Sequence, residues 1–200
     1  NANNTNTRIG GALASQRNII SGNTTNGITV SSGTTPTSNI AIMGNYIGLD
    51  KNGDTLTGAT GTGITLSAPN GIKIGGASTD ENNVISGNLL YGISFTGVVG
   101  QAVQVYGNII GLKPDGETSA GNGTAGIYLV SNNNPTGVLQ IGGASSGQGN
   151  IISGNPVTGI YMTNANMLTN PASVKGNKIG VTASGAAAGN GTNGIRFTGV

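Results

Sequence analysis

The segment ISGNLLYGISF at residues 85–95 reveals the fold, because two related segments of the same length occur elsewhere in the chain. They read ISGNTTNGITV at 20–30 and ISGNPVTGIYM at 152–162, so successive copies lie 65 and 67 residues apart. Ile-Gly-Gly triplets that begin at Ile9, Ile74 and Ile141 recur at the same spacings. Self-similarity at a fixed period is the sequence signature of a repeat protein.

A shorter period lies inside this one. Gly-Ile-x-apolar units recur with gaps of 36, 29, 34, 33 and 35 residues, and they begin at Gly27, Gly63, Gly92, Gly126, Gly159 and Gly194. Each gap holds three short segments in which buried-type and other residues alternate, which is the pattern of strands with one buried face. We therefore predict an all-β fold, a right-handed single-stranded parallel β-helix with three strands per coil. It has about six coils of roughly 33 residues, paired in a super-repeat of about 66 residues, and residues 1–200 form one solenoid domain.

Stacking of like residues on like residues completes this fold, since a single coil cannot bury its inward side chains alone. One predicted inner row contains Ile28, Ile64, Ile93, Ile127, Ile160 and Ile195. A second contains Val30, Leu66, Phe95, Leu129, Met162 and Phe197. β-branched and large apolar residues suit such a buried, pleated surface.

Glycine and asparagine are predicted to form the corners of the coils. Three Gly-Asn pairs follow a strand at Gly22-Asn23, Gly87-Asn88 and Gly154-Asn155, and a second series of asparagines contains Asn45, Asn108 and Asn177. A sharp corner favours positive φ, which glycine adopts freely and asparagine tolerates. Stacked asparagine side chains also form hydrogen-bonded ladders.

With these units in place, the chain resembles the parallel β-helix repeats of the pectate-lyase-like superfamily. The Ile-Gly-Gly and Asn-Tyr-Ile-Gly-Leu segments are similar to those of long bacterial surface and secreted repeat proteins. The resemblance covers essentially all of the sequence and implies the fold. It implies no single function, because that superfamily includes lyases, hydrolases, phage tailspikes and adhesins.

Composition narrows the classes of partner. The eight basic residues are dispersed and the net charge is +2, whereas nucleic-acid binding needs a clustered basic face. No apolar run approaches the length that spans a bilayer, so we expect no membrane insertion by this segment. The chain has no histidine and no cysteine, and we expect no catalytic residues and no cofactor, calcium being the one ion considered further.

Calcium is considered because two acidic loops occupy the same place in successive super-repeats. They contain Asp54 and Glu117, and the third copy, residues 181–185, carries no charge. One interpretation is a pair of solvated turns built on Asn-Gly and Asp-Gly. The alternative is a Ca²⁺ site in which Asp54 and Glu117 supply oxygen ligands from neighbouring loops.

A row of outward positions gives a candidate carbohydrate-binding surface. The row is predicted to contain Thr29, Thr65, Ser94, Tyr128, Tyr161 and Arg196. Two stacked tyrosines beside an arginine, Tyr128, Tyr161 and Arg196, are suited to sugar binding by ring stacking and hydroxyl hydrogen bonds. The alternative is a cross-strand ladder that only stabilises the sheet.

Both ends of the sequence interrupt the pattern, and we expect either a longer parent protein or coils that stack between subunits. The function predicted is a non-enzymatic structural repeat module of an extracellular bacterial or archaeal fibre, filament or cell-surface protein that self-associates end to end. The alternative is an adhesive, glycan-binding β-helix, such as an adhesin or a tailspike shaft. A polysaccharide lyase or hydrolase is the third hypothesis, and paired carboxylates for it are not seen in the sequence.

Overall fold

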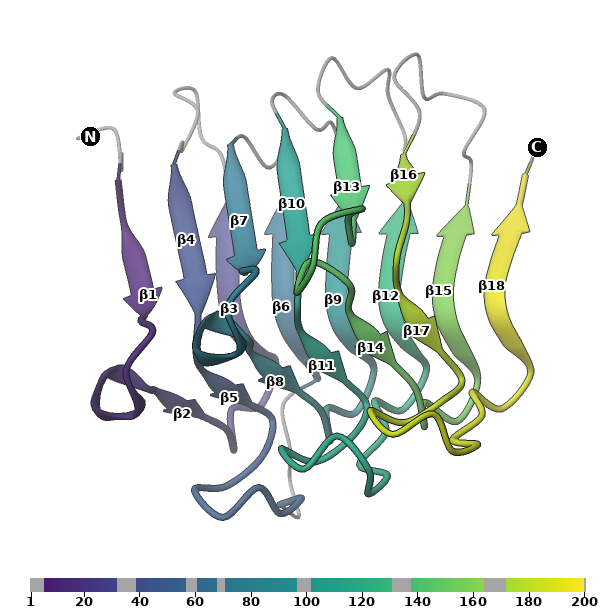
Figure 1. Cartoon of the computed structure of the whole chain (residues 1–200), viewed down its shortest axis with the longest axis horizontal. Coiled ribbons are helices and arrows are strands. Elements are labelled where there is room, and N and C mark those ends of the chain that lie inside the picture. Colours follow the sequence, from purple (N-terminus) through teal and green to yellow (C-terminus); the bar gives the residue numbers. More distant parts are fainter. Residues whose placement is uncertain are drawn as a thin grey trace.

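A computed structural model describes residues 6–31, 39–56, 61–67, 71–96, 102–130, 138–163 and 172–199. These residues form a parallel β-solenoid with three sheets of six strands, so the chain completes five turns from β1 to β16 (Figure 1). The predicted three-sided parallel β-helix is confirmed. The prolines at 36, 69, 135 and 171 lie outside the described residues.

Each sheet contains every third strand in chain order. Sheet 1 contains β1 (Arg8–Gly10), β4 (Ile40–Met43), β7 (Ile72–Gly75), β10 (Val103–Tyr106), β13 (Leu139–Ile141) and β16 (Ser173–Val174). Sheet 2 contains β2 (Ile19–Ile20), β5 (Tyr46–Ile47), β8 (Val84–Ile85), β11 (Ile109–Ile110), β14 (Ile151–Ile152) and β17 (Lys178–Ile179). Sheet 3 contains β3 (Asn26–Ser31), β6 (Thr62–Ser67), β9 (Tyr91–Thr96), β12 (Ala125–Val130), β15 (Thr158–Thr163) and β18 (Asn193–Thr198). Three consecutive strands make one coil, and the coils are numbered 1 to 6 in chain order.

The register places like residues on like residues, as the repeat predicts. In sheet 3, Ile28 pairs with Ile64 and Ile64 with Ile93, and this row continues to Ile195. The row that contains Val30 and Phe95 runs beside it through the same pairings. Both rows belong to one continuous apolar core along the solenoid.

Loops leave the coils at two different corners, and the corner alternates. In the odd-numbered coils, a loop of several residues joins sheet 1 to sheet 2, and it contains the 3₁₀ turns η1 (Ala14–Gln16) in coil 1 and η2 (Thr79–Glu81) in coil 3. In the even-numbered coils, a hairpin joins sheet 2 to sheet 3, closed by the bridges Leu49–Thr55, Leu112–Ser119 and Val181–Ala187. This alternation is the structural reason for the two-coil super-repeat. No helix in the described residues is long and apolar enough to cross a membrane.

A matched pair of substitutions tests the core. Phe95 is fully buried in coil 3, whereas Phe197, at the equivalent position of coil 6, is 53% exposed. We expect Phe95→Ala to lower the free energy of unfolding by about 3–5 kcal/mol, because it removes a buried ring and leaves a cavity. Phe197→Ala should cost less than ~1 kcal/mol. Urea denaturation followed by circular dichroism measures both, and equal losses would contradict the packing described.

Candidate functional site

The outward face of sheet 3 carries the predicted row of side chains. The register pairs Thr29 with Thr65, Ser94 with Tyr128, Tyr128 with Tyr161, and Tyr161 with Arg196. The side chains in coils 4 to 6 interact in sequence. The Tyr128 and Tyr161 rings lie 5.4 Å apart between centroids at 47°, and the Arg196 guanidinium lies 4.9 Å from the centroid of the Tyr161 ring.

A third tyrosine, Tyr91, extends this row and was missed in the sequence. Its ring stacks on Tyr128 with a centroid distance of 4.4 Å and an interplanar angle of 11°. Strict alternation from Ile93 assigns Tyr91 to the interior, but Gly92 interrupts the alternation. A β-carbon at Gly92 would lie 3.0 Å from the Ile110 side chain and 2.6 Å from the Gly126 carbonyl oxygen, so Gly92 faces inward beside Ile93. The invariably repeated Gly-Ile pair was the signal for this interruption.

We name this set the aromatic ladder: Tyr91, Tyr128, Tyr161 and Arg196. Tyr128 has a tyrosine on either side, and Tyr161 lies between Tyr128 and the Arg196 guanidinium. Sugars stack on exposed ring faces, whereas the Tyr128 and Tyr161 rings each have a neighbouring rung of the ladder on both sides. The ladder therefore offers ring edges and hydroxyl groups for binding, and its rings stabilise pairing of the strands.

Two phenol groups of the ladder have a raised pKa. Burial raises the pKa of Tyr91, and the neighbouring Tyr161 raises it further. Burial is also the main cause of the raised pKa of Tyr128, with contributions from Tyr91 and Tyr161. The Tyr161 hydroxyl accepts a hydrogen bond from Thr198 at 3.2 Å. The hydroxyl groups of the ladder can thus donate and accept hydrogen bonds.

Asparagine side chains form a continuous ladder at the corner between sheets 1 and 2. Each amide nitrogen donates to the side-chain oxygen of the next asparagine at 2.8–3.0 Å, through Asn18, Asn45, Asn83, Asn108, Asn150 and Asn177. The backbone N–H of each asparagine donates to the same oxygen. We name this set the first asparagine ladder.

A second asparagine ladder lies at the corner between sheets 2 and 3. It contains Asn88, Asn122, Asn155 and Asn190, with amide-to-oxygen distances of 2.8–3.0 Å. Asn23 does not join it: this side chain is exposed and donates only to the Ser21 carbonyl at 3.5 Å. Gly22, Gly87 and Gly154 have φ near +70° (72°, 72° and 71°), and the asparagines that follow them do not. Asparagine is therefore used for hydrogen bonding at these corners, and glycine supplies the positive φ.

Five members of the two ladders were not predicted: Asn18, Asn83, Asn150, Asn122 and Asn190. The signal for the first three was present in the sequence. Every coil contains an Asn-x-apolar triplet, whose last two residues form the sheet 2 strand. The residue after the triplet is serine in odd coils, as at Ser86, and glycine in even coils, as at Gly111. Ser86 donates to the Leu112 carbonyl and accepts from the Gly111 N–H, which joins the two kinds of coil.

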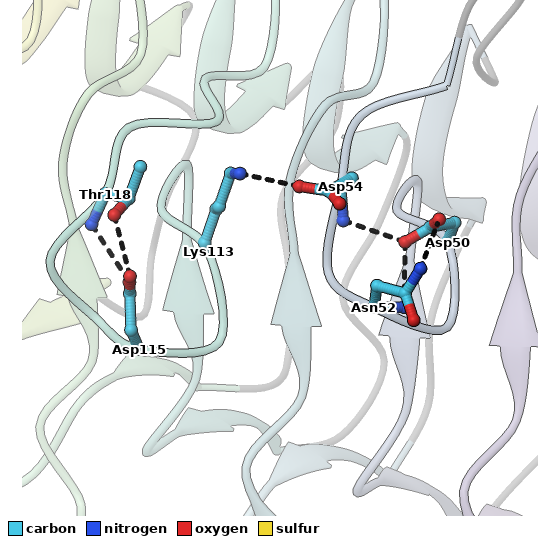
Figure 2. A network of polar contacts seen from close by, with 6 residues as sticks. All are labelled: Asp50, Asn52, Asp54, Lys113, Asp115 and Thr118. Atoms are coloured by element: carbon cyan, nitrogen blue, oxygen red, sulfur yellow. Dashed lines mark hydrogen bonds and ion pairs between the residues drawn. The ribbon is translucent and has the colours of Figure 1, made fainter.

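The acidic loops stack on each other, but their carboxylates are held apart. Asp54 accepts a 2.6 Å charge-assisted hydrogen bond from Lys113 of the next hairpin (Figure 2). Glu117 instead faces the third hairpin, where the Ser184 N–H and hydroxyl both donate to it at 2.8 Å. The residues proposed as shared Ca²⁺ ligands thus point to different hairpins, with Lys113 beside Asp54.

The other two carboxylates shape their own turns. Asp50 accepts from the N–H groups of Asn52 and Asp54 at 2.8 Å, and Asp115 accepts from the Thr118 N–H and hydroxyl (Figure 2). These bonds lower the pKa of both carboxyl groups, chiefly through the Asp54 N–H for Asp50 and the Thr118 N–H for Asp115. Among the residues that the structure describes, no three acidic side chains converge as a metal site would require.

Comparison with known proteins gives no relative: no family model, no curated protein and no solved structure matches this chain.

The first asparagine ladder is testable at its centre. Asn108→Ala removes the acceptor for two Asn83 N–H groups and the donor to Asn150. We expect roughly 3 kcal/mol or more of lost unfolding free energy, since each buried group left unpaired costs about 1–3 kcal/mol. Asn23→Ala, outside the ladder, is the control and should be nearly neutral. Chemical denaturation compares the two, and a neutral Asn108→Ala variant would contradict the ladder's role.

The contact between Glu117 and the third hairpin predicts an acid-sensitive contribution to the free energy of unfolding. Hydrogen bonds from Thr182 and Ser184 hold the pKa of Glu117 below its ordinary value. A lowered folded-state pKa stabilises the fold above the unfolded pKa, about 4.3, and this contribution is lost as pH falls further. We expect Glu117→Gln to melt at a lower temperature than the parent at pH 7, and this difference to shrink as pH falls through the lowered pKa of Glu117. Asp80→Asn, on the exposed η2 turn, is the control, and a difference that persists in acid would refute the assignment.

Proposed function

We propose that this chain is a non-enzymatic structural segment of an extracellular bacterial or archaeal fibre or cell-surface protein, extended by stacking of coil on coil. We further propose that it belongs with the parallel β-helix proteins of the pectate-lyase-like superfamily, a proposal that its Ile-Gly-Gly and Asn-Tyr-Ile-Gly-Leu segments support. The single observation that carries the proposal of a structural segment is the unbroken register of the coils. In sheet 3 each inward residue pairs with the like residue of the next coil, from Ile28 with Ile64 to Ile160 with Ile195, so a further coil continues the same rows.

The asparagine ladder makes the two faces of the stack complementary. In the first asparagine ladder, five amides each donate to the asparagine of the next higher-numbered coil: Asn18, Asn45, Asn83, Asn108 and Asn150. The Asn177 side chain donates backward to the Ile141 carbonyl and, within the described residues, has no onward acceptor. The Asn18 side-chain oxygen likewise accepts no hydrogen bond from the described residues. A coil beginning like coil 1 therefore supplies the acceptor that a coil ending like coil 6 needs.

The order of the loops favours the same arrangement. Coil 6 is an even-numbered coil with a hairpin at the corner between sheets 2 and 3, whereas coil 1 carries its loop at the other corner. Placing a coil of the coil 1 type on coil 6 preserves the alternation and avoids a collision of two like loops. The chain offers this continuation to a further stretch of the same protein or to a second copy.

The acidic and aromatic groups support a structural role rather than a catalytic one. Asp50, Asp54, Asp115 and Glu117 all accept hydrogen bonds that fix the hairpins. The aromatic ladder joins strands of four coils. Carbohydrate binding remains the alternative, and it would use the hydroxyl edge of the ladder, because the Tyr128 and Tyr161 rings have neighbouring rungs on both sides.

End-to-end association of the 200-residue chain is the test. Sedimentation velocity over a range of concentrations should show head-to-tail oligomers, and electron microscopy should show rods that lengthen with concentration. Phe197→Lys should reduce association by placing a charge on the apolar end surface. Leu89→Lys, at a side-chain position 60% exposed on the flank of the rod, should not. Equal effects of the two substitutions, or a monomer at all concentrations, would refute self-association.

A further inference from the structure

A groove on the outside of sheet 2 has no part in coil stacking. It has a volume of about 600 Å³, within the range of small-ligand pockets. Ile109 and Ile151 lie on its floor, and its walls come from the odd-coil loops around Thr79 and Asn82 and around Ser145 and Ser146. It is therefore an apolar slot with polar walls, built from four successive coils.

The internal repeat shows what occupies the equivalent place in the first super-repeat. There, Arg17 precedes Asn18 of the asparagine ladder, as Asn82 precedes Asn83, and Tyr46 is the counterpart of Ile109. The Arg17 guanidinium lies 4.3 Å from the centroid of the Tyr46 ring. Its Nε donates to the Gly44 carbonyl oxygen at 3.2 Å. A flat guanidinium, stacked on the sheet 2 floor and bonded to the corner carbonyl, thus fits this part of the fold.

In the second super-repeat these side chains are shorter, while the carbonyl acceptor remains. Asn82 replaces the arginine and Ile109 replaces the tyrosine, which leaves the space open. The carbonyl oxygen of Gly107, the counterpart of Gly44, accepts no hydrogen bond from the described residues. The Asn82 side-chain oxygen lies against Gly107 and is buried, so it is out of reach of a ligand in the groove. The groove therefore has an apolar floor and one carbonyl acceptor without a donor.

The charged residue that lines the groove is Lys178. Asp80 and Glu81 belong to the η2 turn, which contributes to the wall. Glu81 pairs with Lys73 at 3.6 Å, which leaves Asp80 as the acidic side chain of this turn without an ion-pair partner among the described residues. Lys178, at the far end, donates through its ammonium group to the Ala183 carbonyl. Guanidinium is weakly hydrated and stacks on flat surfaces, so it tolerates an apolar floor better than an ammonium group does.

We propose that this groove binds the side chain of an arginine presented by an extended segment of a partner protein. The guanidinium takes the place that Arg17 takes in the first super-repeat and donates to the Gly107 carbonyl, as Arg17 donates to the Gly44 carbonyl. The Ser145 and Ser146 wall faces the backbone of the segment.

Isothermal titration of the whole chain with blocked tripeptides tests the assignment. The probes are glycyl-arginyl-glycine and its versions with lysine and with citrulline, a neutral isostere of arginine. The arginine peptide should bind with a stoichiometry of one, and the others about ten-fold more weakly, since hydrogen bonds from a charged donor contribute about 1.5–3 kcal/mol. Asn82→Arg, which copies the first super-repeat, should fill the groove and abolish binding.

The matched variant is Arg17→Asn, which opens the equivalent position over Tyr46. It should raise the stoichiometry from one to two, a result that a general loss of stability does not produce. Absence of binding to the parent chain, equal binding of the lysine peptide, or binding unchanged by Asn82→Arg would each overturn the proposal. Self-association that Asn82→Arg abolishes, without peptide binding, would assign the groove to a second copy and also overturn it.

Discussion

The buried asparagine amide is the constraint on which the solenoid depends. An amide in an apolar interior costs free energy unless its donors and acceptor are all paired. In the first asparagine ladder, each amide needs acceptors from both neighbouring coils: Asn108 donates back to the Ile74 carbonyl and forward to the Asn150 side-chain oxygen. A coil is therefore incomplete by itself, and each coil must place an asparagine at the same height and angle as its neighbours.

Variation is confined to the corners because the interior is held to this pattern. Odd coils extend the corner before sheet 2, and even coils extend the corner after it. Extra residues at a corner leave the inward rows and the ladders in register, whereas an extra residue within a strand would reverse its two faces. The groove beside Asn82 lies at such a corner, where Asn82 and Ile109 stand in the places of the longer Arg17 and Tyr46.

The sequence was sufficient for the fold because its information is repeated. Period, strand alternation and the inner rows through Ile93 and Phe95 were all predictable, since like residues recur at fixed intervals. Tyr91 was not predictable from alternation, because the inward Gly92 shifts it to the outer face. The covering of the Tyr128 ring faces, and the separation of Asp54 from Glu117 by Lys113, depend on side-chain directions between coils. No pattern along a single chain encodes those directions.

The strands run across the rod, so the hydrogen bonds between them run along it. A force that pulls the two ends apart therefore acts along these bonds and separates one coil at a time, instead of shearing many strands together. Each coil that opens shortens the rod by only about 4.8 Å. It releases roughly 33 residues, which extend to about 110 Å. Under tension the rod would therefore extend stepwise. Each coil that opens replaces its ~4.8 Å of rod by more than twenty times that length of extended chain, while the remaining coils stay intact.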